Sequence, residues 1–394
     1  MVKIAVINSH PIQYFTPLYA YLNADPDIEI TALYCSDAGL RETYDKEFSQ
    51  KVMWDIDLLD GYSSIFLGDT FGKRTPGGFF SLICPEIWRE IYNKPYDIIW
   101  LHGYNYFAYI LAFFAAKFSG KKVFYRSETH LNLKKSKWLK FVRDGILRIF
   151  FRYVDSFLAI GSLNKAYYES LGVDPSKISL VPYTVDNERF SRDNSTWKKN
   201  RKNLLNQNGL DYQLPTILFC SKLAARKNPI LVIDAVKSLK DQNCNLIIAG
   251  SGPLQDGLEA YVAELGKTNI CFMGFVNQSE LPRLYSAVDI FVLPSENEPW
   301  ALVVNEVMAA GLPVILGPKI GCAPDLVRHR ENGIILDELT VSCLNLHFST
   351  LLSHPQIMQE MGRESQRIIS NWSYDNCLDG IREGLEINGF KIKA

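Results

Sequence analysis

The amino-acid sequence predicts an α/β protein made of two domains, each built around a mainly parallel sheet. Strand-length apolar runs alternate with helix-length segments along the whole chain, a pattern typical of βαβ units. The pattern is interrupted once, over residues 191–213, and then begins again. A chain of 394 residues, of which 47% are hydrophobic and 22% charged, is long enough for two domains with separate cores.

Six strands are predicted before the interruption. They are residues 3–7, 28–34, 98–101, 123–126, 156–160 and 178–181. The interruption carries a basic run at residues 198–203 and little periodic apolar content, so we expect part of it to connect the domains. The N-terminal domain is therefore predicted over residues 1–195.

Six further strands are predicted after the interruption. They are residues 216–220, 245–249, 270–273, 290–293, 314–316 and 333–336. They predict a second domain over residues 210–372, with a C-terminal helix from about residue 373 to 394 packing back on the first domain. Because the carboxyl ends of parallel strands meet at one edge of a sheet, we expect ligands to bind at that edge of each domain.

Composition excludes several classes of protein. The net charge of −1 provides no global field for binding nucleic acid. No run of 18 apolar residues is present, and the chain starts on a predicted strand instead of a signal peptide. The eight cysteines form no Cys-x-x-Cys pair, which favours reduced thiols over disulfides or zinc. We expect a cytoplasmic protein.

The most informative segment is residues 294–314. An apolar strand leads into a loop that Pro294 and Pro299 keep irregular, and residues 302–310 have helical apolar spacing. Glu298 therefore lies in a loop beyond the carboxyl end of a strand. Glu306 lies about two turns into the next helix.

The start of this predicted helix is suited to binding phosphate. The backbone N–H groups of Trp300, Ala301 and Leu302 lie between the two glutamates, and free N–H groups at a helix start bind anions. A carboxylate on each side can accept hydrogen bonds from sugar hydroxyls. The segment predicts a site for a nucleotide diphosphate that carries a sugar.

Glu298 and Glu306, followed by Met308-Ala-Ala-Gly-Leu-Pro-Val314, resemble the E-x7-E signature of family 4 of the retaining glycosyltransferases. In that family the first glutamate contacts the donor sugar, the second binds the ribose, and the intervening amides hold the diphosphate. The resemblance implies the GT-B fold, in which two Rossmann-like domains face each other across a cleft.

The resemblance covers most of the chain. Similar motifs occur in the same order and at fitting spacing, at residues 97–102, 159–162, 182–190, 219–227 and 249–254 and at Gly333. Ser221 and Ala301 replace glycines that the family places beside phosphate, and Val307 replaces an alanine. Lys222 replaces the usual arginine, so an ammonium group stands where the family has a guanidinium that can donate two parallel hydrogen bonds.

Several residues at predicted strand ends of the second domain are candidates for donor binding. Lys222 and Lys227 can neutralise a leaving diphosphate without a metal, or they are solvated loop lysines. Gly250 and Gly252 form a strand-to-helix turn that either contacts the ligand or serves turn geometry alone. Val276 follows another strand, in a loop that borders the base in the family.

The first domain carries candidates for the reaction centre and the acceptor. His10, His102 and His130 follow predicted strands, where a single histidine is more often structural than catalytic. Glu128 falls where the family usually has a histidine lining the reaction centre, with His130 as the alternative.

An acidic pair and a basic segment in the first domain each allow two interpretations. Asp55 and Asp57 resemble the Asp-x-Asp metal motif of the GT-A architecture, but they lack its context, so we expect no metal. Residues 133–152 hold seven basic residues and one acidic residue among large apolar groups. This segment can contact an anionic membrane surface, especially through its lysine-rich first half, or it is an amphipathic helix that packs on the sheet.

Together these patterns predict a metal-independent hexosyltransferase at the inner face of the membrane or in the cytoplasm, and the family resemblance implies that it retains the configuration of the sugar. Its donor is a nucleotide-diphosphate sugar, and its acceptor a glycan, a lipid-linked glycan or a small molecule. Two alternatives stay open. One is a GT-B sugar-nucleotide epimerase, and the other is a non-catalytic partner subunit that binds a nucleotide sugar.

Overall fold

The structure is a computed structural model that describes residues 1–45, 48–67, 75–130, 137–191, 194–239, 244–266 and 269–392, with the backbone alone for 137–141 and 194–199. The chain divides into two compact units. Unit 1 comprises Met1–Thr43, Val52–Thr184 and Tyr374–Ala394, and unit 2 comprises Tyr44–Lys51 and Val185–Ser373. Residues 185–195 thus lie in unit 2, although the sequence placed them in the first domain. The sequence also did not indicate that 44–51 contacts the second domain.

Unit 1 contains a seven-stranded parallel sheet in the order β5-β2-β1-β6-β7-β8-β9. Its strands are β1 Val2–Asn8, β2 Ile28–Tyr34, β5 Ser63–Phe66, β6 Ile98–His102, β7 Lys122–Arg126, β8 Ser156–Ala159 and β9 Ile178–Leu180. All six strands that were predicted in this half are confirmed. The sequence missed the edge strand β5 and the short pair β3 Thr43–Asp45 and β4 Gln50–Val52.

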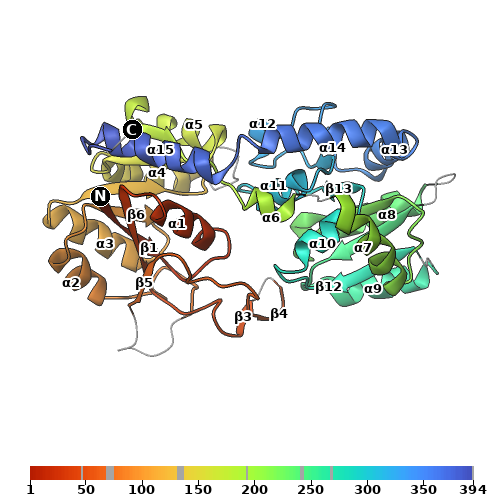
Figure 1. Ribbon diagram of the computed structural model, residues 1–394, viewed down its shortest axis with the longest axis horizontal. Helices are drawn as coiled ribbons and strands as arrows, with labels where there is room; N and C mark the ends of the chain where they lie inside the picture. Colours follow the sequence, from red (N-terminus) through yellow and green to blue (C-terminus); the bar gives the residue numbers. More distant parts are fainter. Residues whose placement is uncertain are drawn as a thin grey trace. The chain divides into compact units, whose positions relative to one another are not determined.

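Helices cover the sheet of unit 1, so the middle residues of its central strands are mainly apolar. Residues 98–101 of β6, for example, are all buried. The helices are α1 Thr16–Asn23, α2 Glu86–Asn93, α3 Phe107–Phe118, α4 Lys137–Phe151, α5 Ser162–Ser170 and α15 Tyr374–Ile387. The C-terminal α15, in blue, lies among the red-to-yellow elements of this unit (Figure 1). A side chain at Gly380 would overlap the Leu180 carbonyl, so glycine permits α15 to approach β9 closely.

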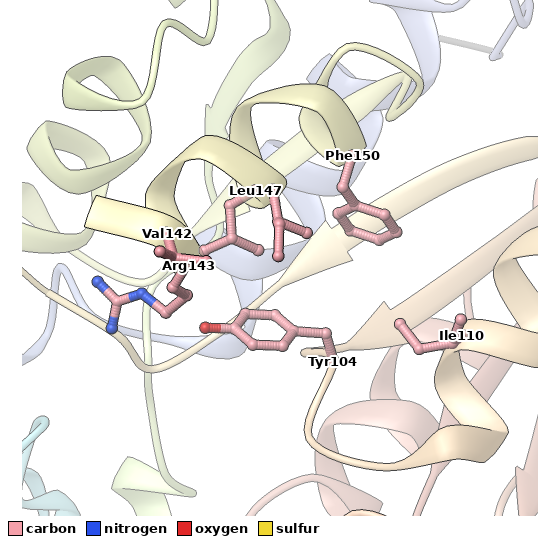
Figure 2. Close-up of a pocket in the computed structure, with 7 residues that line it drawn as sticks. Tyr104, Ile110, Val142, Arg143, Leu147 and Phe150 are labelled. Carbon is pink, nitrogen blue, oxygen red and sulfur yellow. The ribbon is translucent and has the colours of Figure 1, made fainter. Parts of the chain in front are cut away.

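An apolar pocket of about 380 Å³ lies between α3 and α4 in unit 1. Figure 2 shows the side chains of α4 and the two residues Tyr104 and Ile110 around it. The lining is apolar apart from Arg143 and the Tyr104 hydroxyl; it consists of Tyr104, Ile110, Val142, Arg143, Ile146, Leu147 and Phe150.

Unit 2 contains a six-stranded parallel sheet in the order β12-β11-β10-β13-β14-β15. Its strands are β10 Thr216–Cys220, β11 Asn245–Ala249, β12 Ile270–Gly274, β13 Ile290–Leu293, β14 Val314–Leu316 and β15 Gly333–Ile335. Every strand predicted for the second domain is confirmed. Its α-helices are α6 Asn187–Phe190, α7 Asn194–Gln207, α8 Pro229–Lys237, α9 Gln255–Glu264, α10 Leu281–Ser286, α11 Leu302–Ala309, α12 Ala323–Leu326, α13 Val341–Leu352 and α14 Pro355–Ile369.

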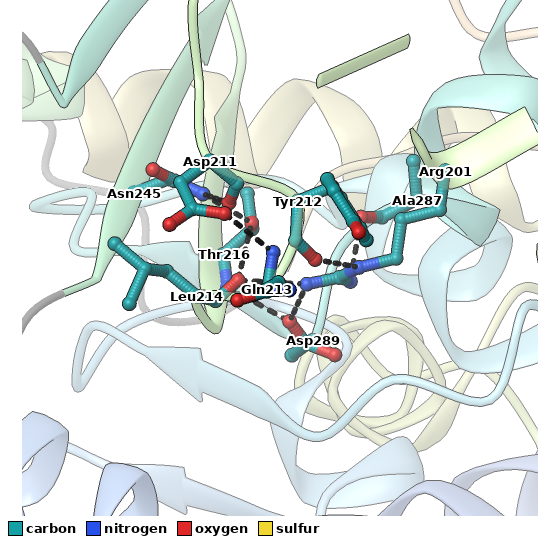
Figure 3. Close-up of polar contacts among 9 residues, drawn as sticks. All are labelled: Arg201, Asp211, Tyr212, Gln213, Leu214, Thr216, Asn245, Ala287 and Asp289. Carbon is teal, nitrogen blue, oxygen red and sulfur yellow. Dashed lines mark hydrogen bonds and ion pairs between the residues drawn. The ribbon is translucent and has the colours of Figure 1, made fainter. Parts of the chain in front are cut away.

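Within residues 191–213, part of which was expected to connect the domains, Asn194–Gln207 form the helix α7 of unit 2. Arg201 on this helix ties it to the sheet, because its guanidinium donates to the carbonyls of Ala287 and Leu214, each at 2.8 Å, and pairs with Asp289 at 2.9 Å. Asp289 also accepts from the Thr216 N–H at 2.8 Å (Figure 3). The sequence did not indicate this helix, because a cation that binds backbone carbonyls looks like a solvated charge in the sequence.

All eight cysteines lie in the described part of the chain as free thiols, five of them buried. Among the described residues, no helix is both long enough and apolar enough to cross a membrane.

Candidate active site

The turns after β10, β11 and β12 meet at one edge of the unit 2 sheet. The Gly250 N–H donates to the Gly274 carbonyl at 2.6 Å, which joins the turn after β11 to the end of β12. Lys222 and Val276 each lie two residues beyond the end of their strand, β10 and β12 respectively. The candidate donor-binding residues that follow β10, β11 and β12 therefore lie at one edge of the unit 2 sheet.

Gly250 and Gly252 have a packing role. Both have positive φ, +130° and +156°, and a side chain at either would overlap the backbone of the turn after β10, at Ser221 and Leu223 respectively. These close approaches account for glycine at both positions. A contact of the two glycines with a ligand stays a proposal.

Lys227 and Glu298 form an ion pair in a nearly dry environment. Glu298 is 4% exposed and Lys227 is 8% exposed, and their side chains are in direct contact. Arg226 adds a second cation, 3.2 Å from the Glu298 carboxylate. Burial lowers the pKa of Lys227, and the Glu298 charge opposes this change. The candidate sugar-binding carboxylate is thus already paired with two cations.

Lys222 is also engaged, by a segment that is distant in the sequence. Its ammonium lies 3.6 Å from the Asp45 carboxylate and 4.5 Å from the centre of the Phe48 ring. The Phe48 carbonyl accepts from the Ser251 hydroxyl at 2.9 Å, and its ring packs edge-on against Phe275 at 5.1 Å. Lys222 is therefore not the freely solvated lysine of the alternative interpretation.

The loop before α11 holds its backbone in an unusual conformation. Ala301, which precedes the helix, has φ +82° and ψ +74°, a left-handed conformation that costs an alanine about 1–2 kcal/mol. Among the described residues, the N–H groups of Ala301, Leu302 and Val303 have no hydrogen-bond partner. These three donors at the start of α11 form a candidate anion site.

The side chain of Trp300 belongs to the core of unit 2. The residue is buried, its indole N–H donates to Asn305 Oδ1 at 2.9 Å, and its ring lies 5.2 Å from that of Trp372. Trp300 therefore anchors the loop through its side chain. Trp300 has further interactions, and the free donors of the loop are those of the three residues that follow it.

Glu306 is buried and forms no ion pair with any residue that the structure describes. It is 1% exposed, its Oε2 accepts from the Tyr285 hydroxyl at 2.6 Å, and its Oε1 has no partner within the part of the chain that the structure describes. Burial raises its pKa to about 7, while the Tyr285 hydrogen bond and the Arg189 charge lower it. The unpaired Oε1 can accept a hydrogen bond from a ligand.

In unit 1, His102 lies at the carboxyl end of β6 in an aromatic environment. Its Nε2 is 2.8 Å from the Tyr19 hydroxyl, and its ring lies 4.5 Å from Phe15 and 5.2 Å from Trp100. Burial, followed by the Arg126 charge, holds its pKa well below the usual value. His102 is therefore neutral at pH 7.

Arg126 was missed from the sequence, although it lies at the centre of this edge. It is 2% exposed and stacks against Phe15 and Tyr183, at 5.8 and 5.3 Å from the ring centres. It forms no ion pair among the described residues, and one terminal nitrogen, NH1, has no hydrogen-bond partner there. The Tyr183 hydroxyl donates to Glu128 at 2.7 Å, so the predicted Glu128 lies next to this cluster.

The other two candidate histidines of unit 1, His10 and His130, also follow strands of the sheet. His10 Nδ1 lies 2.8 Å from the Ser9 hydroxyl, just after β1, and His130 is buried after β7. Asp57, one of the two residues of the discounted metal motif, accepts from the Leu59 N–H at 2.9 Å as part of a turn. Among the described residues, no group of three or more His, Cys, Asp and Glu side chains is placed to hold a metal ion.

Sequence reasoning missed Arg226, Tyr285 and Asp45 in unit 2. Arg226 had a signal, because it directly precedes Lys227 in a loop after a strand. Tyr285 and Asp45 had none, because their partners are distant in the sequence.

Comparisons with known proteins agree with this geometry. Residues 200–368 match the family model of "Glycosyl transferases group 1". A structure of Anabaena HepE in complex with UDP-glucose superposes with a TM-score of 0.74 and 18% identity, covering 98% of this chain and 100% of the other. Sucrose-phosphate synthase from Thermosynechococcus elongatus superposes with a TM-score of 0.73 and 17% identity, covering 97% and 98%. The chain has the GT-B fold.

Sequence relatives of this GT-B chain are named glycosyltransferases. An uncharacterized glycosyltransferase of Methanocaldococcus jannaschii is 36% identical over 143 residues, or 36% of each chain. The GDP-mannose-dependent alpha-(1-6)-phosphatidylinositol monomannoside mannosyltransferase of Mycobacterium tuberculosis is 26% identical over 248 residues, or 59% of this chain and 62% of the relative. The D-inositol 3-phosphate glycosyltransferase of Corynebacterium glutamicum is 32% identical over 202 residues, or 49% and 47%. The matches span between 36% and 62% of the length of these relatives.

Proposed function

We propose that the protein is a glycosyltransferase of the E-x7-E type, which moves a hexosyl group from a nucleotide-diphosphate donor bound to unit 2. The observation that carries this proposal is the start of α11, where the N–H groups of Ala301, Leu302 and Val303 have no partner among the described residues and lie between two buried glutamates. Anion-binding donors between two hydroxyl-binding carboxylates match the chemistry of a sugar diphosphate.

In this proposal each side chain of the site contacts one part of the donor. The unpaired Oε1 of Glu306 accepts from a ribose hydroxyl. Lys227, with Lys222, stabilises the negative charge that develops on the departing diphosphate, which does not require a metal. Glu298 accepts from hydroxyls of the transferred sugar. Arg226 is the most exposed member of the Glu298 cluster, so it can turn away when those hydroxyls bind.

The proposed reaction retains the configuration of the sugar. The bond between the anomeric carbon and the diphosphate oxygen breaks, and the acceptor oxygen forms a new bond on the same face. The acceptor proton passes to the leaving phosphate oxygen, so the protein needs no separate base. His102, Glu128, His10 and His130 of unit 1 are the candidates for contacts with the acceptor.

The donor and the acceptor are open within this proposal. The HepE structure contains UDP-glucose, whereas the Mycobacterium relative is named a GDP-mannose-dependent phosphatidylinositol monomannoside mannosyltransferase. UDP-glucose and GDP-mannose are therefore the first two donors to test.

Donor turnover in the absence of acceptor distinguishes this proposal from its alternatives. A transferase should slowly release free nucleoside diphosphate and a hexose of unchanged anomeric configuration. A sugar-nucleotide epimerase would yield an epimerised sugar, and a non-catalytic subunit would bind the donor and leave it intact. Lys227→Met should abolish release, whereas Lys237→Met, at an exposed position on α8, is the matched control. Release by both variants at the wild-type rate would refute the role of Lys227.

A further inference from the structure

A stripe of large apolar side chains on α4 of unit 1 is exposed. Val142, Ile146, Ile149 and Tyr153, spaced three or four residues apart, have exposed fractions between 45% and 62%. At 3.6 residues per turn this spacing places Val142, Ile146 and Ile149 on one face of α4, and Tyr153 lies in the turn that follows the helix. The opposite face, with Leu147 and Phe151, is buried in the core of the unit. Helix α4 therefore has two apolar faces, one of which has no core to cover it.

The apolar pocket of about 380 Å³ borders this stripe. Val142 and Ile146 belong to both the stripe and the pocket wall, and the wall continues through Phe150 to Ile110 and Tyr104 (Figure 2). The exposed apolar surface is thus hollowed on one side. A single extended hydrocarbon group fits such a hollow better than a flat protein face does.

Cations flank the stripe on both sides. Counting 100° per residue, Arg148 lies roughly 130° from the centre of the stripe on one side and Arg143 about 90° on the other, and Arg152 lies in the turn that follows the helix. Arg148 and Arg152 are exposed. The one acidic residue of α4, Asp144, is occupied by Arg143 at 2.7 Å. An apolar stripe between arginines is the pattern of a helix that lies in a membrane interface, where long cationic side chains reach the headgroups.

We propose that α4 docks unit 1 onto an anionic membrane surface, with Val142, Ile146, Ile149 and Tyr153 inserted among the lipid chains and the adjacent pocket receiving part of one chain. Arg148 and Arg152 then contact the lipid phosphates. Charge selects lipid over a second copy of this protein, because a symmetric contact through α4 would bring the same arginines against each other. The proposal does not depend on sugar transfer.

The sequence had placed such a contact in the lysine-rich first half of residues 133–152. Residues 133–136 lie outside the described residues, as do the side chains of 137–141. The proposal therefore rests on the second half of the segment, where both the apolar stripe and the arginines are described.

Co-sedimentation with vesicles tests the proposal. The wild-type protein should sediment with phosphatidylcholine vesicles that contain phosphatidylglycerol, and its binding should weaken as salt rises. Arg148→Ser/Arg152→Ser should bind roughly 30-fold more weakly, since each cation near the surface contributes about fivefold. Ile146→Ser/Ile149→Ser should bind at least about tenfold more weakly because inserted apolar area is lost.

The matched control is Leu346→Ser/Ile230→Ser, which removes equally exposed apolar groups from unit 2. It should sediment like the wild type. Equal sedimentation of all three double variants would overturn the proposal. So would a wild-type protein that is dimeric by light scattering, does not sediment, and becomes monomeric on Ile146→Ser/Ile149→Ser, because the stripe would then be an interface between copies.

A separate variant tests the pocket. Ile110→Trp fills it from α3 and leaves the stripe and the arginines in place. This variant should keep the salt dependence of vesicle binding but bind severalfold more weakly. An unchanged affinity would exclude the pocket from the docking surface.

Discussion

Glu306 provides a pH-dependent test of the proposed ribose contact. Its carboxyl has a pKa of about 7 in the unliganded protein, raised by burial from an ordinary value of 4.5. Only the ionised carboxylate accepts strong, charge-assisted hydrogen bonds from both ribose hydroxyls. We therefore expect nucleoside affinity to rise with pH through 7, about tenfold between pH 6 and pH 8, because one proton is released on binding.

The same residue makes the unliganded protein less stable as pH rises. Since the folded-state pKa lies above the unfolded one, the folded state binds the extra proton, and stability present below pH 4.5 is lost between pH 4.5 and about 7. The shift corresponds to about 3 kcal/mol at most. Glu306→Gln keeps an oxygen for the Tyr285 hydroxyl and removes the ionisation. The variant should therefore unfold at a higher temperature than the wild type at pH 8, and the gap should shrink toward pH 5.

Isothermal titration with uridine, guanosine and adenosine measures the binding effect, because these nucleosides carry no phosphate that titrates near pH 6. The wild type should show the tenfold change for the nucleoside it binds, and Glu306→Gln should bind more weakly with no change between pH 6 and pH 8. An identical pH dependence in both proteins would refute the reasoning, since the titrating group would then not be Glu306.

Three other predictions concern the same edge of unit 2. Ala301→Gly should raise the free energy of unfolding by about 1 kcal/mol, because glycine adopts the positive φ of this position without strain; a lower melting temperature would show that Ala301 is not strained. Glu298→Ala should lower that free energy by about 3 kcal/mol, because it leaves the buried Lys227 without its carboxylate, whereas Glu296→Ala, at an exposed position, should have little effect in the same denaturant titration. Donor turnover should persist in excess EDTA if Lys222 and Lys227 replace a metal, and its loss with recovery on adding Mg²⁺ or Mn²⁺ would contradict that role.

The strands and the helix α11 could be predicted because their signals are local. Buried parallel strands are continuous apolar runs, and the helix that follows Glu298 has regular spacing ended by Gly311 and Pro313. The substitution of Ala301 for a family glycine was noticed in the sequence. Only the structure shows that the φ angle of Ala301 is positive and that this conformation strains the start of the helix.

The contacts that sequence reasoning missed are those between distant segments. Asp45 reaches Lys222 from the short strand β3, which lies far from it in the sequence, and Tyr285 reaches Glu306 from another helix. Arg126 ends a strand and looked like an ordinary edge residue. Its burial depends on Phe15 and Tyr183, which come from other parts of unit 1. Such contacts follow from the tertiary fold and leave no regular spacing in the sequence by which they could be predicted.

Thermal shift with nucleotides tests the central claim most directly, namely that unit 2 binds a nucleotide diphosphate at the start of α11. The panel should contain UDP, GDP and ADP with the corresponding monophosphates. One diphosphate, at about 100 times its dissociation constant, should stabilise the protein by about 2.7 kcal/mol, and its monophosphate should bind more weakly because it lacks the second phosphate for Lys227 and the free N–H groups. The diphosphate effect should shrink in Lys227→Met. No shift with any of the six nucleotides, or equal shifts from the mono- and diphosphate, would contradict the account.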